Sequence, residues 1–130
     1  MPKEGRNQGN ITTKGQTALA SGDFALGAGW GSSTVAVTAG SNDHFGSIVI
    51  TAVTGGGLAQ ATATVTLTFK SAFASAPAGV LVTATNNNSA ATHLAPTGGT
   101  ATTTTATWTS STIPVNGQTY TFTWFIPSRA

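Results

Sequence analysis

The chain has 130 residues, enough for one domain with a single core, and only 6% of them are charged, against about a quarter in ordinary soluble domains. It has no cysteine, which excludes disulfides, thiolate metal sites and cysteine nucleophiles. Five basic and three acidic residues give a net charge of +2, but no stretch interleaves Lys or Arg with aromatic residues, so we expect no nucleic-acid binding.

Residues 1–29 predict an extended N-terminal arm. The segment is rich in Gly, Gln, Asn and Ser, which disfavours a core of its own. Its scattered apolar side chains are Ile11, Leu19, Phe24 and Leu26, and its cations are Lys3, Arg6 and Lys14. We expect the four apolar side chains to fill pockets on a partner and the three cations to add a modest, salt-sensitive attraction. The alternative is that the arm folds back and covers an edge strand of its own domain.

The N-terminus is polar and lacks the hydrophobic segment of a signal peptide. No run in the chain approaches the roughly 20 apolar residues that cross a bilayer. We therefore expect a protein that is made in a cytoplasm and has no membrane contact.

Residues 30–130 predict a β domain. Apolar residues and threonines alternate strictly from Ala61 to Lys70, which is typical of a strand with one buried face. Strands are expected at 34–38, 47–53, 61–69, 80–85, 100–109 and 119–126, with 92–99 as a loop or a short edge strand. Short strands at this spacing, separated by turn residues, predict an all-β fold, either an antiparallel β-sandwich or a jelly-roll-like barrel, preceded by the arm.

The expected interior is built mostly from Ala and Val, with few large side chains. These large side chains are Phe45, Phe69, Phe73, Trp108, Tyr120, Phe122, Trp124 and Phe125. In the last strand Tyr120, Phe122, Trp124 and Ile126 share one face. A small core and uncharged edge strands favour association. We therefore expect a homo-oligomer, a trimer, with its Thr-rich faces at or beside the subunit contacts.

The inventory of acids and histidines disfavours an enzyme. The acids are Glu4, Asp23 and Asp43, and the histidines are His44 and His93. Nothing local brings Asp23 and Asp43 together as a carboxylate pair. Asp43 and His44 are adjacent, so on extended backbone they point apart and predict a polar turn rather than a metal pair. No phosphate loop and no nucleophile elbow occurs. We expect no catalytic residues, no cofactor and no metal.

Two tryptophans are candidates for stacking on sugar rings. Trp30 and Trp108, if exposed, would suit a carbohydrate-binding module. A role in the core or at an interface is the favoured interpretation for both.

Several short motifs between residues 30 and 126 resemble the β-rich module of tailed-bacteriophage virion proteins. They are Trp30-Gly31, Gly40–Ile50, Ala63–Phe69, Ala76-Pro77, Val80–Thr83 and Tyr120–Trp124. This module recurs at the ends of tail fibres and in small head or fibre proteins. The resemblance implies a virion structural protein with a sandwich fold and carries over no catalytic residues.

An arm followed by a compact β body is the arrangement that a capsid decoration (cement) protein needs. We expect the protein to reside in the virion, to bind the major capsid protein or another virion protein, and to stabilise the assembled shell by binding only that form. The alternative is a receptor- or glycan-binding tail-fibre or head-fibre module, with a host glycan as its ligand.

Overall fold

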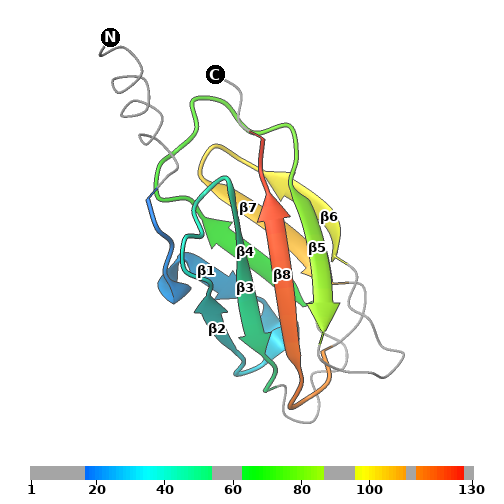
Figure 1. Ribbon diagram of the computed structural model, residues 1–130. Coiled ribbons are helices and arrows are strands. Elements are labelled where there is room, and N and C mark those ends of the chain that lie inside the picture. Colours follow the sequence, from blue (N-terminus) through cyan, green and yellow to red (C-terminus); the bar gives the residue numbers. More distant parts are fainter. Residues whose placement is uncertain (1–16, 54–62, 87–95, 111–113, 128–130) are drawn as a thin grey trace.

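Two four-stranded antiparallel sheets pack face to face, as a computed structural model of residues 17–53, 63–86, 96–110 and 114–127 shows (Figure 1). The first sheet contains, in spatial order, β1 (Phe24–Leu26), β4 (Thr64–Thr68), β7 (Thr105–Ser110) and β6 (Pro96–Ala101). The second contains β2 (Thr34–Val37), β3 (Phe45–Thr51), β8 (Thr119–Phe125) and β5 (Leu81–Asn86). Two short 3-10 helices, η1 (Ser21–Asp23) and η2 (Ala28–Trp30), flank β1. The prediction of an all-β sandwich is confirmed.

The core lies between the two sheets and follows the period-2 alternation of the strands. On β8, the predicted stripe of Tyr120, Phe122 and Trp124, continued by Ile126, is buried. Trp108 on β7 packs against this stripe, with its ring centroid 6.1 Å from that of Phe122 and 6.2 Å from that of Trp124. The aromatic residues of β8 therefore join the two layers.

The threonine alternation also appears as predicted on β4. Val65 and Leu67 are fully buried, whereas the intervening threonines face outward. Two of them lie opposite threonines of β7, with 3.2 Å between the Oγ1 atoms of Thr64 and Thr109 and 3.4 Å between those of Thr66 and Thr107. The outer face of the first sheet is thus a hydroxyl surface.

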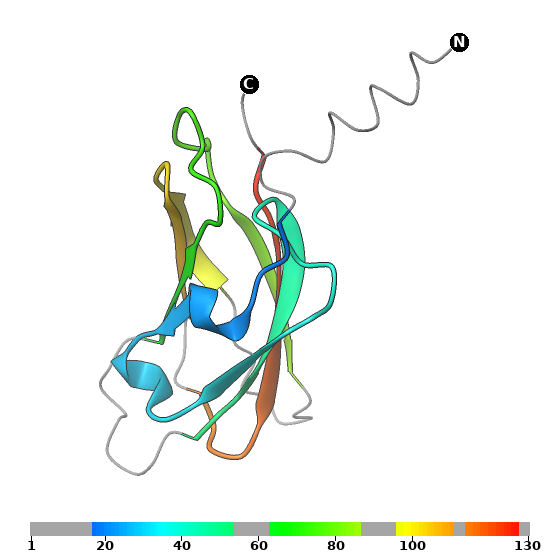
Figure 2. The same cartoon turned by 90° about the vertical axis from the view of Figure 1, so that its left-hand side faces the viewer.

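Residues 19–30 belong to the sandwich, which corrects the expected boundary at residue 30. In Figure 2 this segment runs across one side of the sandwich from the second sheet toward the first. Its course is fixed by a hydrogen bond of 3.0 Å from the backbone N–H of Leu19 to the carbonyl of Ser41, and by the pairing of β1 with β4. Of the expected arm, residues 1–16 lie outside the described residues.

The prediction of one continuous strand at 100–109 is wrong, because residues 102–104 are not part of a strand. The chain turns at residues 102–104, between β6 and β7. The hydroxyl Oγ1 of Thr102 accepts hydrogen bonds from the backbone N–H groups of Thr104 and Thr105, at 3.1 and 3.0 Å. A threonine hydroxyl thus forms a turn that contains no Gly, Asn or Pro.

Candidate functional site

Three large apolar side chains form a row on the outer face of the second sheet. Phe45 on β3 pairs with Phe125 on β8, which pairs in turn with Leu81 on β5. Residues directly opposite in antiparallel strands place their side chains on the same face. Phe45 and Phe125 are each 50% exposed and Leu81 is 66% exposed. We call Phe45, Phe125 and Leu81 the apolar row.

The apolar row corrects the expectation that Phe45 and Phe125 lie in the core. Trp124 and Ile126 point inward, so strand alternation turns the intervening Phe125 outward. Phe45 follows because it pairs with Phe125. Hydrophobicity alone placed both rings inside, whereas the alternation along the final strand carries the signal that places Phe125 outside.

The other side chains on this outer face are small and uncharged. The positions next to the apolar row carry Ser47, Thr123 and Thr83, which also pair across β3, β8 and β5. The sequences of β2, β3, β5 and β8 contain no Asp, Glu, Lys, Arg or His. The large side chains of the face are therefore concentrated at one end of an uncharged sheet.

A buried polar turn fixes the start of β3 and so the position of Phe45. The side-chain Oδ1 of Asn42 accepts hydrogen bonds from the backbone N–H groups of His44 and Phe45, at 2.9 and 3.2 Å. The backbone N–H of Asn42 donates to the carbonyl of Phe45 at 2.9 Å, and its carbonyl accepts from the indole Nε1 of Trp124 at 3.3 Å. The turn before β3 is thereby anchored to β8.

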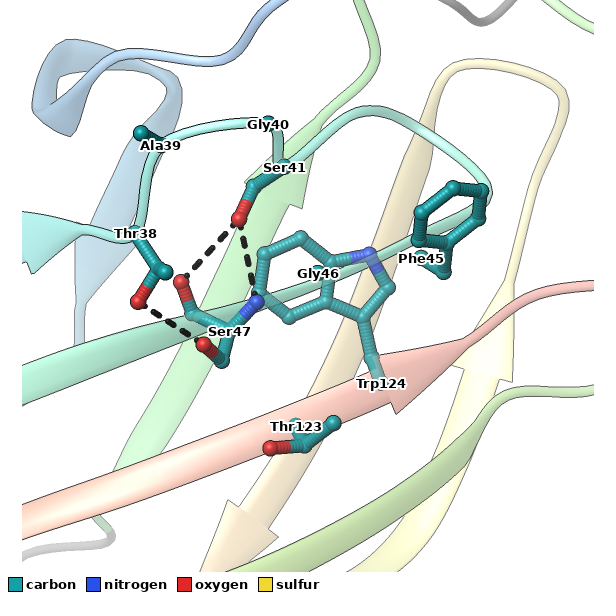
Figure 3. Close-up of a pocket in the computed structure, with 9 residues that line it drawn as sticks. All are labelled: Thr38, Ala39, Gly40, Ser41, Phe45, Gly46, Ser47, Thr123 and Trp124. Carbon is teal, nitrogen blue, oxygen red and sulfur yellow. Dashed lines mark hydrogen bonds between the residues drawn. The ribbon is translucent and has the colours of Figure 1, made fainter.

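A shallow depression of about 230 Å³ lies beside Phe45 (Figure 3). It is lined by Thr38, Ala39, Gly40, Ser41, Phe45, Gly46, Ser47, Thr123 and Trp124. The hydroxyl of Ser47 donates to that of Thr38 at 2.8 Å, and the hydroxyl of Ser41 accepts from the backbone N–H of Ser47 at 3.1 Å. Its wall therefore carries one pair of bonded hydroxyl groups, from Ser47 and Thr38, among mainly apolar atoms, with the Phe45 ring at one end (Figure 3).

The predicted anchor residues of the arm divide into two groups. Leu19 and Phe24 are each only 8% exposed and belong to the core of their own sandwich, and Leu26 packs against it. The Phe24 ring lies 5.5 Å from that of Trp124. These three side chains are therefore not available to fill pockets on a partner, and the expectation for them is wrong. The alternative expectation, that this segment covers an edge strand of its own domain, agrees with the pairing of β1 with β4. Ile11, Lys3, Arg6 and Lys14 lie outside the described residues.

The two described carboxylates serve the fold. Asp23 forms an ion pair of 3.0 Å with the Nζ of Lys70, and Asp43 is fully buried and accepts backbone hydrogen bonds from Lys70 and Ser71. The imidazole Nδ1 of His44 lies 3.3 Å from the carbonyl of Ile126. Asp43 and His44 thus form the polar turn that the sequence predicts. In the described part of the chain, no three His, Asp or Glu side chains gather as metal ligands.

Trp30 and Trp108 are both fully buried. The favoured core interpretation is confirmed for both residues, and neither offers a ring for sugar stacking.

Comparisons with protein-family models, curated proteins and solved structures find no match to this chain. Within the described ranges, no helix is long and apolar enough to span a membrane.

Proposed function

We propose that this protein is a bacteriophage virion structural protein, a capsid decoration protein that binds the assembled shell and stabilises it. The observation that carries the proposal is the neutral outer face of the second sheet with its apolar row. Adjacent large apolar side chains on a surface mark contact with another macromolecule. The resemblance of residues 30–126 to phage virion modules supplies the class of assembly.

The proposed mechanism is stabilisation by linkage. A protein that binds only the assembled shell stabilises that shell by RT ln(1 + L/Kd), where L is the free concentration of the protein, and so opposes disassembly. The partner is the major capsid protein or another virion protein. Since the sandwich core uses Leu19 and Phe24, the attachment role falls on the remaining predicted anchors, namely Ile11, Lys3, Arg6 and Lys14.

Two measurements test this proposal. Counting this protein in purified virions by mass spectrometry distinguishes hundreds of copies, as a decoration protein requires, from the handful that a tail component gives. Co-sedimentation with undecorated shells then compares wild type with a variant in which Lys3, Arg6 and Lys14 are replaced by Gln. We expect the variant to bind more weakly and with less dependence on salt. Lys70→Gln removes the same type of charge from the sandwich and serves as the control. A handful of copies, or equal binding by both variants, contradicts the proposal.

A second candidate function is a glycan-binding fibre module, and the depression beside Phe45 favours it. The hydroxyl groups of Thr38 and Ser47 lie next to a half-exposed aromatic ring, and this combination suits a saccharide. NMR titration with host surface saccharides tests it. Shifts confined to the residues that line the depression, and lost in Phe45→Thr, support this function, and unchanged spectra contradict it.

A further inference from the structure

We infer that the outer face of the second sheet binds the same face of a second copy of this chain, about a two-fold axis that runs along β8. Figure 1 shows β3, β8 and β5 side by side, and their pairing places Phe125 at the centre of the apolar row, between Phe45 and Leu81. This contact occupies the face on which the proposed function rests, and it leaves attachment to the shell to Ile11, Lys3, Arg6 and Lys14, so either test can fail without the other.

Charge is the first argument for this occupant. The four strands of the face carry no charged residue, so a charged partner surface would lose its hydration without gaining an opposite charge. A second copy of the same face is neutral, and its hydroxyl and apolar groups match those that it meets. Electrostatic complementarity therefore favours the face itself as its own partner.

The order of side chains in the apolar row is the second argument. Rotation about an axis along β8 sets Phe125 against Phe125 and reverses the row, so that Phe45 of each copy meets Leu81 of the other. The two Phe125 rings thus meet at the centre, and on each side the Phe45 ring of one copy meets the Leu81 side chain of the other. Such a contact is isologous, because each residue pair occurs twice.

The area of the face is the third argument and fixes the direction of the axis. With Phe45 and Phe125 half exposed and Leu81 more so, the apolar row offers about 300 Å². A stable pair buries about 800 Å² on each partner, so the hydroxyl rows must also take part. An axis along β8 overlays β3, β8 and β5 over their length, including Thr121 and Thr123 of β8, and leaves only β2 outside the overlap. An axis across the strands would overlay the apolar row alone.

The two-fold pair differs from the trimer expected from the sequence. In a closed trimer each subunit presents one surface to a different surface of its neighbour. The apolar row would then meet something other than itself. The mass of the oligomer therefore distinguishes the two-fold pair from the trimer.

Sedimentation equilibrium at tens of micromolar tests the contact. We expect twice the chain mass for wild type. For the double variant Phe45→Thr/Phe125→Thr we expect a rise of at least tenfold in the dissociation constant. Its circular dichroism spectrum should be unchanged, and its unfolding midpoint should be close to that of wild type at a dilution where both proteins are monomeric. Val115→Thr replaces another exposed apolar side chain, in the turn before β8, and should leave the mass unchanged. A monomeric or trimeric wild type, or a double variant that associates as wild type does, overturns the inference.

Cross-linking tests the axis while keeping the apolar row intact. The natural chain has no cysteine, so single-cysteine variants report one position each. Packed sheets lie about 10 Å apart, beyond the reach of a disulfide, and a short bis-maleimide is the suitable probe. We expect Thr123→Cys on β8 to give covalent dimers. Thr68→Cys, on the outer face of the first sheet, should not. Equal yields from both variants, or none from Thr123→Cys, overturn the inference.

Discussion

Asp43, which is fully buried, accepts a hydrogen bond of 2.9 Å from the backbone N–H of Lys70. Its second carboxylate oxygen accepts another, of 3.0 Å, from the N–H of Ser71. Asp43 lies in the turn that leads into β3 of the second sheet, and Lys70 follows β4 of the first sheet. One side chain therefore joins the two layers where the chain enters the face that carries the apolar row.

This link predicts a specific loss of stability. In Asp43→Asn the amide keeps one acceptor oxygen, and its NH₂ group faces a backbone donor. We expect the free energy of unfolding to fall by about 1–3 kcal/mol, because a buried N–H is left unsatisfied. Urea denaturation measures the change. Asp23→Asn, which loses the partly exposed ion pair with Lys70, is the matched control and should cost about 1 kcal/mol or less. Equal losses in the two variants would contradict the assigned role of Asp43.

The close approach of Gly46 and Ser41 predicts a second effect. A Cβ atom at Gly46 would lie 2.4 Å from the Cβ and 2.8 Å from the Cα of Ser41. We expect Gly46→Ala to lower the free energy of unfolding by about 1–3 kcal/mol, because the turn must shift. At Gly22 an added Cβ meets nothing within 4 Å, so Gly22→Ala is the control with little expected change. Removing the Ser41 side chain in the double variant Ser41→Gly/Gly46→Ala should recover part of the loss. A Gly46→Ala protein as stable as wild type would show that the turn yields easily.

The sequence predicts those parts of the fold that rest on local alternation. The strand at 61–69 and the stripe on β8 are examples, because period-2 patterns report directly which side chains face the core. The strand β1 has only three residues, too few for a pattern, and its place is set by pairing with β4, some 40 positions away in the sequence. The core positions of Leu19 and Phe24 are therefore a tertiary property.

The apolar row could not be predicted from the sequence, because its formation depends on how distant strands pair. Alternation along β8 turns Phe125 away from the core, but Phe45 is placed on the same face only once its register with Phe125 is known. The apolar row exists only because three strands pair at those positions. The sequence likewise predicts Asp43 only as a turn residue. Its hydrogen bonds to Lys70 and Ser71 could not be predicted, because these partners are 27 and 28 positions away.

The hairpin between β6 and β7 provides a third prediction. Oγ1 of Thr102 accepts hydrogen bonds from two backbone N–H groups in the turn, and Val has the same shape without the acceptor. We expect Thr102→Val to lower the free energy of unfolding by about 1 kcal/mol, with amide exchange fastest at Thr104 and Thr105. Thr103→Val, an exposed neighbour in the same turn, is the control. If both variants exchange alike, the hydroxyl of Thr102 does not stabilise the turn.

Two N-terminal deletions separate the stability of the sandwich from attachment to a shell. Deleting residues 1–16 leaves every described core residue in place, so we expect an unchanged urea midpoint. Deleting residues 1–29 removes Leu19, Phe24 and the whole of β1. The two side chains alone contribute about 3–6 kcal/mol of burial, a large part of the 5–15 kcal/mol that is typical of a domain. We therefore expect the longer deletion to unfold at much lower urea, against the sequence-based expectation that residues 30–130 fold independently.

The shorter deletion then serves as the probe of function, because its sandwich is intact. Under the proposed function, the protein without residues 1–16 should co-sediment with undecorated shells far less than the full chain, since it lacks Ile11 and the three cations Lys3, Arg6 and Lys14. The longer deletion cannot serve this purpose, because loss of binding there would follow from unfolding alone. If the protein without residues 1–16 binds the shells as tightly as the full chain, these residues are not the anchor, and the result contradicts the proposed function as equal binding by the Gln variant would.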